Sequence, residues 1–161
     1  MAQEKRSFEQ FLEAVEADYK AFAQSLHDYM QNNGCKATFE EKKTSVLGSY
    51  KHVKSKKSVV NLLAKKYGLV VRIYGENISA YPDFLNTLTE DMVESIEKAG
   101  ECKRLVHNTC SPKCTGYDFV IGSEHFQKCR YNCFEFLATK ENENKIKAFV
   151  ESELKERNVA S

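Results

Sequence analysis

Four cysteines in the last third of the chain have the residue type and spacing that could hold a metal ion. They form two pairs, Cys110 with Cys114 and Cys129 with Cys133, with three residues inside each pair and fourteen between the pairs. Two cysteine pairs separated by a hairpin-sized insert are the layout of a four-thiolate zinc site, although two residues within a pair is the commoner spacing. The pattern therefore predicts a structural zinc ion bound by Cys110, Cys114, Cys129 and Cys133.

The geometry of such a site restricts the local backbone. Zinc–sulfur bonds of about 2.3 Å in a tetrahedron put ligand sulfurs about 4 Å apart. Residues four apart in an extended strand are separated by roughly 13 Å, so each pair must lie on a turn or on a helical turn. Pro112 and Gly116 favour a turn at the first pair, and Asn132 allows one at the second. With all four positions filled by protein, the zinc would stabilise rather than catalyse.

The same cysteines allow other chemistry. Basic residues lie close to them in sequence: Lys103, Arg104, Lys113, Lys128 and Arg130. These cations would balance a thiolate centre, but they would equally lower thiol pKa values, so a thiol-based redox protein or sensor is the alternative function. Free thiols, a reversible disulfide and an iron–sulfur cluster stay open as further alternatives. Cys35 and Cys102 are expected to be small core residues, yet Cys102 or His107 could replace one of the four ligands. We interpret His125 as an ordinary surface residue.

A run of lysines between two expected strands raises a second possibility. Lys51, Lys54, Lys56 and Lys57 could contact phosphates, with Lys65 and Lys66 at the next turn and Tyr50 or Tyr67 to stack on bases. The net charge is only +1, which favours a solvated loop whose lysines discourage edge pairing. Nucleic-acid binding is therefore the third hypothesis, behind the metal and redox functions.

Length and composition fit one globular domain. The 161 residues are 42% apolar and 29% charged, so we expect a single domain over 1–161 with a cysteine-rich metal-binding subregion at about 102–138. No apolar run follows the first residues or is long enough to span a bilayer, which predicts no signal peptide, no membrane association and a reducing, cytoplasmic location. No Ser–His–acid pattern or phosphate-cradling glycine loop is present. A non-enzymatic module that binds a small molecule or a protein partner is therefore favoured.

The apolar periodicity changes along the chain. Residues 8–30 repeat apolar side chains at spacings of three and four, which predicts one helix, or two broken near Glu16. Ser7 and Gln10 form a candidate capping box, and Asn33-Gly34 a helix end. Strands are expected over 36–41, 46–53, 58–64 and 69–74, with a turn at Gly68. They predict an antiparallel meander with one face covered.

The second half mixes both element types. We expect helices over 82–88 and 89–100, then strands over 102–107, 117–121, 125–128 and 134–138, with the last two continuing the sheet, and a final helix over 141–157. Runs of each type, rather than strict alternation, favour an α+β fold. The predicted architecture is an antiparallel sheet packed by N-terminal, middle and C-terminal helices.

Three segments of this chain resemble a known group of proteins. They are Leu69-Val-Val-Arg-Ile-Tyr-Gly, Tyr81-Pro-Asp-Phe-Leu, and Met92 through Cys102-Lys-Arg-Leu. Together, over about residues 8–107, they resemble the YdhG-like group of small bacterial domains of unknown function. The resemblance implies an α+β fold and a bacterial, cytosolic origin, and it carries no catalytic residues. The part from Cys110 onward departs from that group as an added, cysteine-rich segment.

Overall fold

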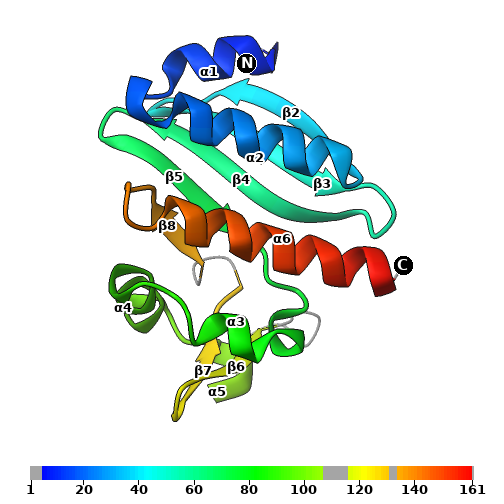
Figure 1. The fold of residues 1–161 in the computed structure, drawn as a ribbon, viewed down its shortest axis with the longest axis vertical. Coiled ribbons are helices and arrows are strands. Elements are labelled where there is room, and N and C mark those ends of the chain that lie inside the picture. The colour runs from blue at the N-terminus through cyan, green and yellow to red at the C-terminus, as the bar shows by residue number, and fades with distance from the viewer. Residues whose placement is uncertain (1–4, 107–115, 131–133, 161) are drawn as a thin grey trace.

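The chain folds into a six-stranded antiparallel sheet with helices on one face and a smaller unit attached at one side (Figure 1). This computed structural model describes residues 5–106, 116–130 and 134–160. The α+β architecture predicted from the sequence is confirmed, because helices flank an antiparallel sheet.

The main sheet has the strand order β1-β2-β3-β4-β5-β8. Its strands are β1 (Lys5–Arg6), β2 (Cys35–Glu41), β3 (Ser45–His52), β4 (Lys57–Lys65), β5 (Gly68–Ile73) and β8 (Glu135–Leu137). Strands β2 to β5 form the predicted meander. Gly68 is the first residue of β5 and has a φ of +145°, a backbone conformation that residues other than glycine rarely adopt. One face of β2 to β4 is covered as expected, whereas Val70 of β5 and Tyr74, which directly follows β5, are also buried.

Helices α1 (Phe8–Ala14), α2 (Lys20–Asn32) and α6 (Glu143–Ala160) lie across one face of this sheet (Figure 1). A short 3-10 turn, η1 (Ala17–Tyr19), separates α1 from α2, so the predicted break near Glu16 is confirmed. Ser7 and Gln10 form the expected capping box at α1. In the described part of the chain, no helix has the length and apolar character needed to cross a membrane.

Residues 75–134, which we call the insertion, leave the sheet after β5 and return at β8. The described elements of the insertion are η2 (Ile78–Ala80), α3 (Pro82–Leu85), α4 (Glu90–Lys98), α5 (Lys103–Val106), β6 (Tyr117–Ile121) and β7 (Glu124–Lys128). Strands β6 and β7 pair with each other as a two-stranded sheet, and Lys128 at the end of β7 also forms an isolated bridge with Glu101. The remaining elements, β1 to β5, β8, α1, α2 and α6, are called the sheet layer.

Two expectations for this region were wrong. Where a strand was predicted over 102–107, the structure has the helix α5. The strand-like pairing is limited to a single bridge between Glu101 and Lys128. After it, the Cys102 carbonyl accepts a hydrogen bond from the N–H of Val106 at 2.9 Å, which closes a helical turn. The predicted strand over 125–128 is real, but it does not continue the main sheet. It pairs with β6, while β8 reaches the main sheet beside β5.

The buried side chains of both regions form one continuous apolar cluster. Its link is aromatic: Phe149 of α6 lies 5.0 Å from the ring of Phe134 and 6.0 Å from that of Tyr81, measured between centroids. Phe134 in turn lies 5.3 Å from the ring of Phe119 in β6. The insertion is therefore packed onto α6 through aromatic rings rather than through strand pairing.

Candidate functional site

Of the four predicted zinc ligands, the structure describes Cys129. Cys110, Cys114 and Cys133 lie outside the described residues, as does His107. Cys129 follows β7 and is half-buried, and Cys102 precedes α5 and is buried. Across residues 5–106, 116–130 and 134–160, no three His, Cys, Asp or Glu side chains gather closely enough to hold a metal ion.

Backbone pairing places Cys102 and Cys129 on the same side of a short antiparallel ladder. Cys102 N–H donates to the carbonyl of Gln127, and Cys129 N–H donates to that of Gly100, both at 2.9 Å. These bonds flank the Glu101–Lys128 bridge, so the two cysteines occupy diagonal positions on the face opposite that pair. Diagonal neighbours in such a ladder are about 7–8 Å apart, within reach of two thiols that share one ion.

The described ends of the remaining cysteine segments lie at the same place. A Cβ added to Gly116, two residues after Cys114, would stand 2.2 Å from the sulfur of Cys102, so that sulfur rests directly on the glycine backbone. Tyr117 and Phe134, which follow the two cysteine segments, stack with centroids 5.3 Å apart. Cys102 is thus a core residue, as expected, but one buried where the segments carrying the other cysteines begin and end.

Two cations expected to serve this centre have other partners. Lys128 is buried, and its Nζ donates to the carbonyls of Glu97 and Ala99 at 3.0 and 2.9 Å, where it caps the end of α4. Arg130 forms an ion pair with Glu76. Both therefore help to hold the insertion together, a role that their proximity in sequence to the cysteines did not indicate.

The three described histidines, His27, His52 and His125, each have a local hydrogen-bond partner. Exposed His125 pairs with Asp118 across β6 and β7, and this hydrogen bond lowers the pKa of the Asp118 carboxyl. His27 on α2 contacts the hydroxyl of Tyr50 at 2.7 Å, and burial lowers the pKa of its imidazole. Fully buried His52 lies 2.8 Å from the Ser55 hydroxyl and 2.9 Å from the amide oxygen of Asn158.

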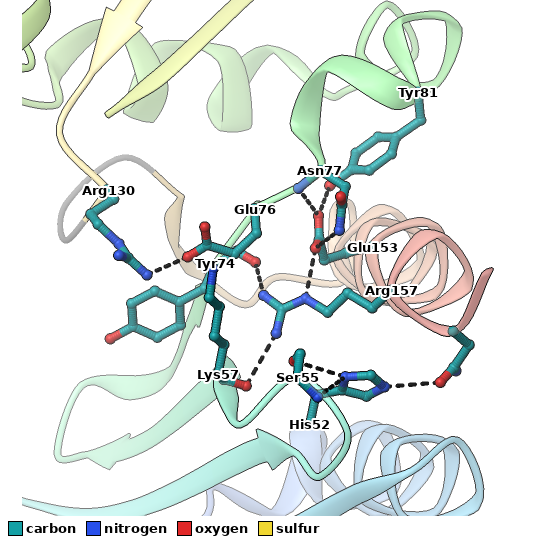
Figure 2. A network of polar contacts seen from close by, with 11 residues as sticks. His52, Ser55, Lys57, Tyr74, Glu76, Asn77, Tyr81, Arg130, Glu153 and Arg157 are labelled. Atoms are coloured by element: carbon teal, nitrogen blue, oxygen red, sulfur yellow. Dashed lines mark hydrogen bonds and ion pairs between the residues drawn. The ribbon is translucent and has the colours of Figure 1, made fainter. Parts of the chain in front are cut away.

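A buried polar network joins α6 to the start of the insertion (Figure 2). Its centre is the ion pair between Glu153, which is 0% exposed, and Arg157, with 2.7 Å between Oε2 and Nε. The carboxylate also accepts bonds from the backbone and side-chain N–H groups of Asn77, at 3.1 and 3.0 Å, and from the Tyr81 hydroxyl at 2.6 Å. Arg157 donates further to the carbonyls of Lys57 and Tyr74.

This network is suited to holding structure. The Glu153 carboxylate receives four donors, which offsets the large free energy of burying its charge. Burial raises the pKa of the Tyr81 hydroxyl well above its usual value, so this group stays protonated and donating. The sequence contains one signal for it: Glu153 and Arg157 fall on the apolar face of α6, in line with Phe149 and Val150.

The lysines proposed for nucleic-acid contact are divided by the fold. Lys51, Lys54, Lys56 and Lys57 lie around the turn between β3 and β4, and all are exposed. The lysines at 65 and 66 lie at the opposite end of the nine-residue strand β4. Tyr50 is 0% exposed and faces α2, so it cannot stack on a base as suggested from the sequence. Tyr67 remains 65% exposed at the far turn.

The comparisons with known proteins supply no relatives. No protein-family model matches the chain, and neither the curated proteins nor the solved structures gave a match.

Proposed function

We propose that residues 102–138 hold one structural zinc ion through Cys110, Cys114, Cys129 and Cys133, in a cytoplasmic module that binds a small molecule or a protein and is not an enzyme. The observation that supports this most is the position of Cys102 and Cys129 on one side of the ladder, beside Gly116 and the stacked rings of Tyr117 and Phe134. In the sequence, Cys114 is two residues before Gly116 and Cys133 directly precedes Phe134.

The small size of the insertion gives zinc a physical role. A two-stranded sheet is marginally stable by itself, and α3 and α5 have only four residues each. A metal that binds the folded insertion and not the unfolded chain adds its binding free energy to folding. Four thiolate ligands leave no coordination position for a substrate, so the role of this zinc would be structural.

Metal analysis tests this directly. Protein purified without added metal should carry one zinc per chain, and Cys129→Ser should lose it. Cys35→Ser is the matched control, because Cys35 lies on β2 in the sheet layer and burial raises the pKa of its thiol to about 11. Zinc-free wild-type protein, or equal zinc in Cys129→Ser and Cys35→Ser, would contradict the proposal.

Thiol labelling separates the zinc site from the redox alternative. With zinc bound, the cysteines of the centre should react with a thiol reagent only after a chelator is added. Cys35 should stay unreactive until the protein unfolds, because burial and not metal protects it. Labelling of the insertion cysteines without a chelator, in metal-free protein, would favour a redox protein. A brown colour with visible absorbance would instead indicate an iron–sulfur cluster.

The ligand set leaves Cys102 and His107 open as replacements for one of the four. The sulfur of Cys102 lies against Gly116, which is two residues after Cys114 in the sequence. Measuring zinc content in Cys102→Ser and in Cys114→Ser resolves this. The proposed set predicts full zinc retention in Cys102→Ser and loss in Cys114→Ser, and the reverse result would exchange Cys102 into the site.

A further inference from the structure

The uncovered face of the main sheet carries two lysines directly opposite each other. Lys36 of β2 and Lys51 of β3 are cross-strand partners. They point away from the helices, because the neighbouring Tyr50 points toward α2, where its hydroxyl meets His27. Like charges directly opposite across a sheet are destabilising. The opposition of Lys36 and Lys51 therefore does not contribute to the stability of the sheet.

The surroundings of the lysines do not neutralise them. Within the described residues, neither Lys36 nor Lys51 takes part in an ion pair. The nearest carboxylate on the same face of β2, that of Glu40, is paired with Lys42 at 2.9 Å. Protection of a sheet edge accounts for Lys36, since β1 pairs with only two residues of β2. It does not account for Lys51, which lies on an interior strand.

The two ammonium groups border a depression on the open face with a volume of about 340 Å³, lined by Lys36, Thr38, Ser49, Tyr50, Lys51 and Ser58. Four of these side chains carry a hydroxyl. The Tyr50 hydroxyl contacts His27 on the other side of the sheet, whereas in the described structure those of Thr38, Ser49 and Ser58 are not engaged in a hydrogen bond. The depression contains no carboxylate. It therefore offers positive charge and hydroxyl donors together, which suits a ligand with several anionic oxygens.

The backbone beside the depression is irregular in two places. A β-bulge interrupts the pairing of β3 with β4 between Tyr50 and Lys51, and bulges often redirect side chains next to binding sites. In the following turn Lys56 adopts a φ of +59°, which is strained for a residue other than glycine or asparagine. A glycine would adopt this conformation without strain.

We infer that this depression binds the phosphoryl group of a small phosphorylated molecule. The charge argues for phosphate over carboxylate, because two lysines are balanced by a phosphate of about −1.5 to −2 but not by one carboxylate. The lining residues argue against nucleic acid as the ligand, because Tyr50 is buried and the six residues offer no exposed aromatic ring on which a base could stack. The inference gives a ligand class to the proposed binding role and does not depend on zinc.

Titration with inorganic pyrophosphate, followed by amide chemical shifts, tests the inference. Shifts should concentrate on β2, β3 and the start of β4, and Lys51→Gln or Lys36→Gln should weaken binding about tenfold each. Lys66→Gln is the control, because it removes the same charge from an exposed position at the other end of β4. Equal affinity in Lys51→Gln and Lys66→Gln, or no binding by the wild type, would overturn the inference.

A charge reversal gives a second, independent readout. Lys51→Glu turns the opposed lysines into an opposite-charge pair, so it should raise the unfolding temperature without ligand while it abolishes pyrophosphate binding. A Lys51→Glu protein that is less stable than the wild type would contradict the like-charge argument. Binding of a short single-stranded oligonucleotide without binding of pyrophosphate would assign the lysines to nucleic acid. Pyrophosphate binding by protein without zinc would separate this inference from the metal proposal.

Discussion

The sheet layer and the insertion reach stability by different means. In the sheet layer, strands β2 to β5 follow one another along the chain and pair with their sequence neighbours, under helices α1, α2 and α6. In the described part of the insertion, one pair of strands and α-helices of four to nine residues pack around a small cluster of aromatic side chains. Helices this short are marginal without tertiary contacts.

The contrast shows where each region obtains its order. The sheet layer can form from local pairing and an apolar face, whereas the insertion depends on ties to α6 and, in our proposal, on zinc. Among the described ties are the aromatic contacts of Phe149 and the buried pair of Glu153 and Arg157, whose carboxylate binds Asn77. Changes to these ties should therefore separate the behaviour of the two regions.

The largest effect is expected for Arg157→Ala. This change removes the cation, 4% exposed, that balances the Glu153 carboxylate, and it also frees the carbonyls of Lys57 and Tyr74. Leaving a buried charge without its partner typically destabilises by about 3–5 kcal/mol. Urea unfolding should show this loss, with the insertion affected together with α6 because Asn77 shares the same carboxylate.

Two comparisons sharpen that measurement. Glu156→Ala, one position away on α6 and outside the network, should change the free energy of unfolding by less than about 0.5 kcal/mol. The double change Glu153→Met with Arg157→Met should be less harmful than Arg157→Ala, since it removes both charges at once. A loss below about 1 kcal/mol for Arg157→Ala would mean that the network does not hold the two regions together.

A smaller, more local effect is expected for Gly116→Ala. The new Cβ would stand 2.2 Å from the sulfur and 2.7 Å from the Cβ of Cys102, so the insertion must shift. Overpacking of this kind costs about 1–3 kcal/mol. Hydrogen exchange should show reduced protection in β6 and β7 with β3 and β4 unchanged. Gly100→Ala is the control, because nothing lies within 4 Å of its added Cβ.

The two regions also differ in how far the sequence predicts them. The elements of the sheet layer other than β1 were predicted to within about three residues at their ends, because helical and strand periodicities are local and the Ser7 capping box and Gly68 turn mark two of those ends. In the insertion, α5 was mistaken for a strand. Strand pairing stops there after the single bridge at Glu101, and the Cys102 carbonyl then accepts the first hydrogen bond of the helix. Neither contact produces a periodic pattern of apolar residues in the sequence.

The candidate site was predictable only in outline. Cysteine spacing indicated a metal site, but not that Cys102 and Cys129 share one side of a ladder, because that depends on register between distant segments. The lysine run was visible, yet the important pair joins Lys51 to Lys36, fifteen residues earlier and outside the run. Cross-strand partners of this kind follow from register, which sequence patterns fix only when the turn is recognised.

The smallest expected effect is a difference in acid sensitivity. In the sheet layer, burial lowers the pKa of His27 from its usual 6.5, so at mildly acidic pH the unfolded chain binds more protons than the folded one. Stability from this group is therefore present above pH 6.5 and is lost as the pH falls through the lower folded pKa.

In the insertion, Asp118 has its pKa lowered from 3.8 by His125, and its contribution is lost only below that pH. The sheet layer should thus respond to acid first. Comparing the wild type with His27→Gln between pH 7 and 5 measures this, because the variant should show a flatter decline in unfolding free energy over that range. An equal slope in the wild type and His27→Gln would remove the imidazole as the cause.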